Sequence, residues 1–100
     1  MPSKLFIMLK SPQEYRSLDV IAALGGEDQI GVLLFQDAVL FPLCGDLRDE
    51  LLDVADEVYV MSDDLEARGF KGQAGPGFRE IDYHEAVDLI MDEYDLTITV

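Results

Sequence analysis

Apolar residues occur along this chain in short runs separated by polar segments. Leu5–Leu9, Ile30–Phe35 and Val58–Met61 are almost entirely apolar and too short for helices, so we expect buried strands. Strands without polar alternation are typical of parallel sheets covered on both faces. Arg79–Asp82 adds a short fourth strand. Leu96–Val100 alternates apolar and polar residues, which predicts a last strand nearer an edge of the sheet.

Helix signals lie between these runs. The first predicted helix starts at Ser11 or at Ser17 and stops at Gly25 and Gly26, and the second starts near Asp46. Two further starts have the pattern of a capping box. These are the pairs Asp63 with Glu66 and Asp82 with Glu85.

Two of these helices have further sequence signals. The short helix after Asp63 should stop at Gly69. The last helix carries Val87, Ile90, Met91 and Tyr94 at helical spacing, which predicts one buried stripe.

The alternation of strands and helices predicts an α/β fold. Crossovers of this length imply right-handed βαβ units and a three-layer α/β/α arrangement around an open, mainly parallel, five-stranded sheet. One hundred residues correspond to a single domain, residues 1–100.

Charge is distributed unevenly along the chain. The net charge is -14; residues 46–100 hold 16 acids and four bases, whereas residues 1–45 hold five acids and three bases. A surface of this sign repels phosphate backbones, so direct nucleic-acid binding is not expected. The acidity fits either solubility in a salty cytoplasm or an acidic docking face for a basic partner.

Targeting and cysteine signals favour the cytoplasm. The N-terminus lacks a signal-peptide pattern, and no apolar run approaches the length of a membrane span. A single cysteine, Cys44, cannot form an internal disulfide.

Ligands of open parallel sheets bind beyond the carboxyl ends of the strands. The first four strand ends supply a polar rim without a complete catalytic set: Lys10 and Ser11, Gln36 and Asp37, Met61 and Ser62, and Asp82 and Tyr83. We expect Gln36, Asp37, Met61 and Ser62 to line an interface or the rim of a pocket. No glycine-rich phosphate loop occurs, and one histidine with one cysteine supports neither a metal site nor a catalytic triad. We therefore expect no cofactor and no metal.

Two features leave alternatives open. Cys44 is either a small buried apolar residue or a reactive thiol close to a helix N-terminus. The apolar segment 38–43 either packs into the core or forms an exposed partner surface, and Phe41 is the residue expected to matter in both cases.

The chain resembles the DsrH/TusB family of the DsrE/DsrF/DsrH-type sulfur-relay proteins over nearly its whole length. The stretches that carry the resemblance are Lys10-Ser11-Pro12, Ser17-Leu18, Leu33–Val39, Val58–Met61, Asp64-Leu65, Ala67–Phe70, Ile81–Tyr83 and Val87–Leu89. The patterns L-x-Q-D-[AG]-[VI] and D-L-x-A-R-G, in this order and at this separation, are its most specific part.

The resemblance implies a cytoplasmic assembly that passes persulfide sulfur between proteins. Members of the TusB-like branch serve 2-thiolation of the wobble uridine of tRNA, and members of the DsrH-like branch serve sulfur oxidation. Both assemble with DsrE-like and DsrF-like subunits, and the DsrE-like subunit carries the sulfur-accepting cysteine.

No family cysteine is retained in this sequence. The position that matches the acceptor cysteine is about Met61, Ile21 matches a cysteine of some DsrH members, and Cys44 stands where a small residue is expected. The resemblance therefore implies a supporting, non-catalytic subunit in a hetero-oligomer. Two alternatives stay open: a sulfur carrier that uses Cys44, and a stand-alone homo-oligomer with a binding or regulatory role.

Overall fold

The computed structural model describes residues 3–10, 21, 23–24, 26, 28–43, 45–70 and 72–100. Most of the first predicted helix and Cys44 lie outside the described residues. Ile21, which belongs to that predicted helix, is buried.

Five parallel strands form one sheet, as predicted. The strands are β1 (Ser3–Met8), β2 (Gln29–Leu34), β3 (Glu57–Met61), β4 (Phe78–Ile81) and β5 (Leu96–Thr99). Their order across the sheet is β4-β3-β2-β1-β5, so the alternating β5 is an edge strand, also as predicted.

Helical segments connect the strands. They are the 3₁₀-helix η2 (Gln36–Leu43), α2 (Gly45–Val54), α3 (Ser62–Ala67), α4 (Tyr83–Asp88) and a π-helical continuation of α4, η3 (Leu89–Glu93).

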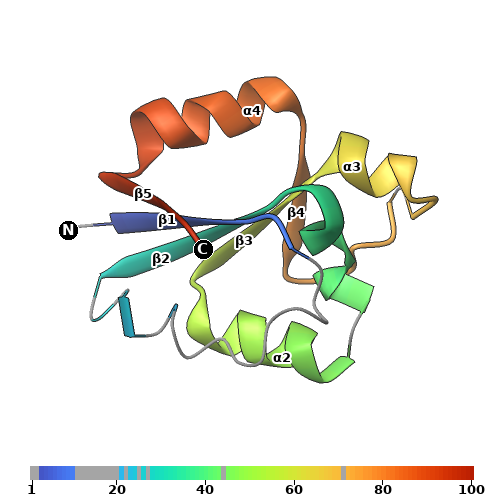
Figure 1. Ribbon diagram of the computed structural model, residues 1–100, viewed down its shortest axis with the longest axis horizontal. Coiled ribbons are helices and arrows are strands. Elements are labelled where there is room, and N and C mark those ends of the chain that lie inside the picture. The colour runs from blue at the N-terminus through green and yellow to red at the C-terminus, as the bar shows by residue number, and fades with distance from the viewer. Residues whose placement is uncertain are drawn as a thin grey trace.

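The strand order explains the three layers. After β1 the chain adds β2, β3 and β4 on one side, and then returns to the other side of β1 with β5. Because parallel crossovers are right-handed, this change of direction puts the last connection on the opposite face of the sheet. Figure 1 shows α4 over one face and α2 under the other, which confirms the predicted α/β/α arrangement.

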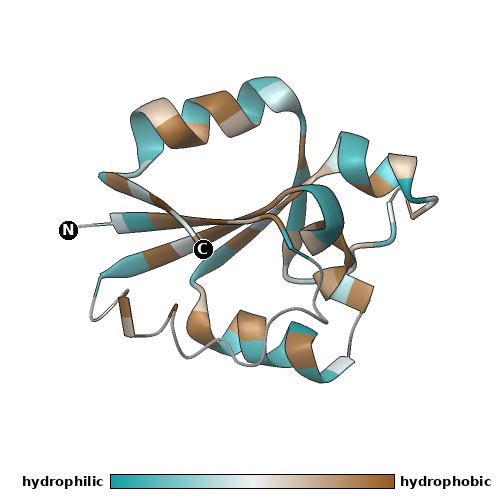
Figure 2. Cartoon of the chain, in the orientation of Figure 1, coloured by the Kyte–Doolittle hydropathy of each residue, from teal (hydrophilic) through white to brown (hydrophobic). Residues whose placement is uncertain are grey.

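The core lies along the strands. Leu5, Phe6, Val32, Leu33 and Val60 are completely buried. Figure 2 shows apolar residues along the strands, and bands of apolar and polar residues on α2 and α4. The pattern is that of strands covered on both faces and helices with one face in water.

The predicted stripe of the last helix is wrong at two positions. Val87 and Met91 are exposed, whereas Ala86 and Leu89 are buried against the sheet. The helix packs through a face rotated by about one residue from the predicted stripe, and it changes to π geometry at Leu89. An apolar line consequently remains on its outer side.

The two predicted capping boxes behave differently. The Asp82 carboxylate accepts a hydrogen bond from the Glu85 amide at 2.8 Å and caps α4. Helix α3, in contrast, begins at Ser62 with Met61 as its cap residue and has no side-chain cap. The predicted capping box at Asp63 is therefore not the cap of α3.

Candidate functional site

The two most specific sequence patterns meet at the carboxyl ends of β2 and β3. Asp64 accepts a hydrogen bond at 2.8 Å from the backbone N–H of Gln36. Arg68 donates from Nε and Nη2 to Oδ1 of Asp37, at 3.2 and 2.8 Å. We call these four residues, Gln36, Asp37, Asp64 and Arg68, the motif junction.

A short helix makes the motif junction possible. Asp64 and Arg68 are four residues apart and so lie on one side of α3. Arg68 also donates from Nη1 to the carbonyl oxygen of Asp64 at 3.1 Å, which fixes the guanidinium against its own helix. The helix thereby presents a carboxylate and a guanidinium to the start of η2.

Backbone strain lies at the same place. Gln36 has φ of 52°, a left-handed conformation that a side chain with a Cβ rarely adopts. Such a residue persists only where its surroundings hold it. The Asp64 carboxylate, which binds the Gln36 amide, supplies one such contact and directs the chain from β2 into η2.

The predicted rim residues separate into two groups. Gln36 and Asp37 are exposed and belong to the motif junction. Met61 is 4% exposed at the end of β3, and Ser62 is half-buried as the first residue of α3. The structure thus joins Gln36 and Asp37 to the helix that follows Met61 and Ser62.

The apolar segment 38–43 packs mainly into the core. Ala38, Val39, Phe41 and Pro42 are buried, with Phe41 at 0% exposure, and only Leu43 is clearly exposed. A side chain without accessible surface in the single chain favours the first of the two alternatives, in which Phe41 is a core residue of η2. Cys44, the other open alternative, lies outside the described residues.

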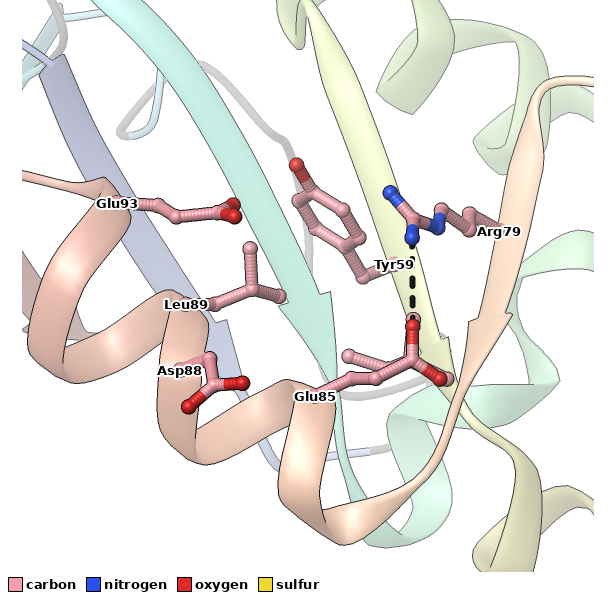
Figure 3. A pocket seen from close by; sticks show the side chains of 7 residues that line it. Tyr59, Arg79, Glu85, Asp88, Leu89 and Glu93 are labelled. Atoms are coloured by element: carbon pink, nitrogen blue, oxygen red, sulfur yellow. Dashed lines mark hydrogen bonds and ion pairs between the residues drawn. The ribbon is translucent and has the colours of Figure 1, made fainter.

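A second feature is a pocket of about 190 Å³ between α4 and the strands β3 and β4 (Figure 3). Its lining consists of Tyr59, Arg79, Ile81, Glu85, Asp88, Leu89 and Glu93. Arg79 forms an ion pair with Glu85 at 3.3 Å. Three of the four charged lining residues are therefore acidic, and the single arginine is paired to a carboxylate.

A pair of tyrosines lies at this pocket: the buried Tyr59 lines it, and the partly buried Tyr94 contacts Tyr59. The hydroxyls of Tyr59 and Tyr94 lie 3.2 Å apart, and their rings meet edge to face with centroids 6.5 Å apart. Burial, and then the hydrogen bond to Tyr59, raises the pKa of Tyr94 above its ordinary value. Gly31 leaves room for this hydroxyl, because a Cβ there would overlap Tyr94.

Sequence reasoning missed the roles of Asp64, Arg68 and the pocket residues. The signal for Asp64 and Arg68 was present in the spacing of the D-L-x-A-R-G stretch, which puts both on one helix face. The pocket had no such signal, since its residues come from separate elements and none forms a spaced motif.

Neither a metal cluster nor a membrane-spanning helix occurs in the described part of the chain. There, no group of three or more histidine, cysteine, aspartate or glutamate residues is placed to hold a metal ion. No described helix has the length and apolar character needed to cross a membrane.

The sequence profile of the family described as "DsrH like protein" matches residues 10–95. The chain belongs to the DsrH-like family. Membership connects the protein with sulfur relay, and the family acts with other sulfur-relay proteins. The motif junction lies within the matched residues and is built from the two most specific sequence patterns.

A solved structure supports the fold. The ychN protein from E. coli superposes with a TM-score of 0.80, covering 100% of both chains at 17% sequence identity. At this identity the likeness concerns the α/β fold alone. No curated protein sequence matches the chain.

Proposed function

We propose that this protein is a supporting, non-catalytic subunit of a cytoplasmic persulfide-relay complex. Its partners are DsrE-like and DsrF-like subunits, of which the DsrE-like one carries the reactive cysteine. The pathways in which such complexes act are 2-thiolation of the tRNA wobble uridine and sulfur oxidation.

One inference carries the proposal: the resemblance puts the position of the DsrE-like acceptor cysteine at about Met61. A persulfide needs a sulfur that can lose a proton, attack a donor and then hold a second sulfur. The thioether of Met61 has carbon on both sides and no proton to lose. It is also 4% exposed, so it serves as a packing residue at the end of β3.

The motif junction supports the same interpretation. Its charged groups bind one another: Asp37 pairs with Arg68, and Asp64 holds the Gln36 amide. Groups that are used in this way stabilise the turn out of β2 and the start of η2. Their role is to maintain the shape of the carboxyl edge beside which a cysteine-bearing partner would work.

Co-expression with DsrE-like and DsrF-like proteins from the same organism tests the proposal. Size-exclusion chromatography should show a stoichiometric complex, and labelled sulfur from a persulfide donor should appear on the DsrE-like cysteine and not on this chain. Omission of this chain should reduce assembly of the complex.

Two results would contradict the proposal. Sulfur loading of this chain that disappears in Cys44→Ser would make it a sulfur carrier. A stable homo-oligomer that ignores both other subunits would make it a stand-alone protein.

A further inference from the structure

The outer side of α4 and η3 exposes an apolar line that the fold does not use. Tyr83 is 65% exposed, Val87 40% and Met91 73%. We call these three residues the apolar stripe. Single exposed apolar residues are ordinary, but these three lie on successive turns, Tyr83 and Val87 in α4 and Met91 in η3.

The contact between this helix and the sheet is made by other residues. Ala86 is 2% exposed and Leu89 4%, and both face the core. Substituting the apolar stripe would therefore leave the helix–sheet packing intact. In the described part of the chain, no other segment covers these three apolar side chains.

Acidic residues alternate with the apolar stripe along the chain. Residues 82–95 contain Asp82, Glu85, Asp88, Asp92, Glu93 and Asp95, and no lysine or arginine. Asp82 caps the helix, Glu85 pairs with Arg79, and Asp95 accepts a hydrogen bond from the amide of Ser3. Asp88, Asp92 and Glu93 remain exposed along the helix.

An apolar centre with a charged margin is the usual anatomy of a protein–protein interface. We propose that the apolar stripe is a docking surface for another protein whose contact face has apolar side chains at its centre and lysine or arginine at its rim. The acidic residues beside the apolar stripe predict a positively charged contact face on the partner, because opposite potentials favour and steer the encounter.

The same charges argue against other occupants. In a two-fold dimer of this chain, both copies would contribute the same patch, so the acids of one α4 would face those of the other. Like charges in such an interface disfavour association. Nucleic acids and anionic lipid surfaces are repelled for the same reason.

This inference rests on the proposed function in one respect: it supplies the contact surface that a supporting subunit needs. The two remain separable in experiment. The complex could form through a different face, and the apolar stripe could bind a basic partner that has no part in sulfur relay.

A synthetic helical peptide with leucines on one face and lysines along both margins is the direct probe. Anisotropy of the labelled peptide should show binding that weakens with added salt, since screening reduces the attraction of exposed charges. A matched peptide with glutamates in place of the lysines should not bind. The double variant Val87→Ser/Met91→Ser should weaken binding about tenfold or more, because few contact residues carry most of an interface's affinity.

The matched control is Leu24→Ser, which changes an apolar side chain of similar exposure, 46%, away from α4. It should bind as the wild type does. Circular dichroism and thermal melting check that all variants are folded.

Three results would overturn the inference: no binding of the lysine peptide, equal binding by the double variant, or self-association of the protein that Met91→Ser abolishes. Repeating the co-expression experiment with the double variant separates the two proposals. Loss of the complex supports both. A complex that forms unchanged leaves the proposed function standing and overturns this docking surface as the site of assembly.

Discussion

Two regions of this molecule carry many charged residues, and they use them in opposite ways. At the carboxyl ends of β2 and β3 the charged groups bind one another, as in the pair Asp37 and Arg68. On the outer side of α4 the charges are nearly all of one sign, and Asp88 and Asp92 are exposed beside Val87 and Met91. The first arrangement maintains the fold, whereas the second is suited to a partner.

The difference changes where function should be sought. The two stretches with the most specific patterns, around Gln36 and Asp64, form a contact within the chain. Helix α4 lies in the same family match, residues 10–95, and has the exposed apolar and acidic surface. A pattern that forms a structural junction identifies the fold and family without identifying the contact surface.

The largest effect is expected from truncation inside η2. Phe41→Ala removes a completely buried ring and should lower the free energy of unfolding by about 3–5 kcal/mol, as large-to-small core substitutions do. Urea denaturation measures the change. The matched control is Leu43→Ala in the same 3₁₀-helix, where 40% exposure predicts a change within about 0.5 kcal/mol.

This pair of variants tests whether segment 38–43 is a structural part of the first region. If Phe41→Ala leaves stability unchanged and only disrupts an oligomer, the ring contributes to an interface and the comparison between the two regions fails.

A second large effect is expected beneath α4. Gly31→Ala puts a methyl group into the space occupied by the Tyr94 hydroxyl and should destabilise the fold by about 2–3 kcal/mol, as overpacking does. Thermal and urea unfolding measure the loss. Gly45→Ala is the control, because nothing lies within 4 Å of the added Cβ apart from its chain neighbours and its own helix backbone.

Rescue makes this prediction specific. Tyr94→Phe removes the hydroxyl that lies nearest to the new methyl group. The double variant should therefore be more stable than the sum of the two single changes predicts. Strict additivity would mean that Tyr94 does not occupy the space above Gly31, and that α4 is seated differently on the sheet.

Sequence patterns were sufficient for the fold because each buried strand is a nearly continuous apolar run. The helix faces were harder to predict. Val87 and Met91 have the spacing of a buried stripe, but Ala86 and Leu89 take the core positions, and nothing local distinguishes the two sets. Only the packing of the helix on the sheet decides which face is buried.

The candidate site shows the same limit. Gln36 and Asp37 could be placed at the sheet's carboxyl edge, since they directly follow an apolar strand. Their partners Asp64 and Arg68 lie 28 and 31 residues further on, and the pairing depends on where α3 begins. Helix α3 begins at Ser62, whereas the sequence predicted Asp63 as the cap residue. No short-range pattern indicated the start at Ser62.

A medium effect is expected at the strained turn. Asp64→Ala removes the acceptor of the Gln36 amide and should cost about 1–2 kcal/mol, the range for an exposed hydrogen bond to a charged group. Asp63→Ala is the control on the same helix. Gln36→Gly should have the opposite sign, since glycine adopts a φ of 52° without steric penalty.

Chemical denaturation of the three proteins gives the order of their stabilities. We expect the Gln36→Gly variant to be the most stable, the wild type to be intermediate and the Asp64→Ala variant to be the least stable. The reverse order would show that the left-handed conformation of Gln36 does not lower the stability of the motif junction.

The smallest effect is expected at the ion pair of the motif junction, and it gives the finest test of the comparison. Asp37 is 61% exposed and Arg68 28%, so water screens their attraction, and the pair should contribute about 0.5–1 kcal/mol in a double-mutant cycle of Asp37→Ala and Arg68→Ala. The coupling should shrink as salt is added, because the pair is accessible to ions.

Neither variant should change binding of the lysine peptide to α4, since the motif junction and the apolar stripe belong to different elements. Loss of peptide binding in either variant, with stability nearly unchanged, would show that the guanidinium and carboxylate also act in recognition, and that the division between a structural edge and a binding face is incomplete.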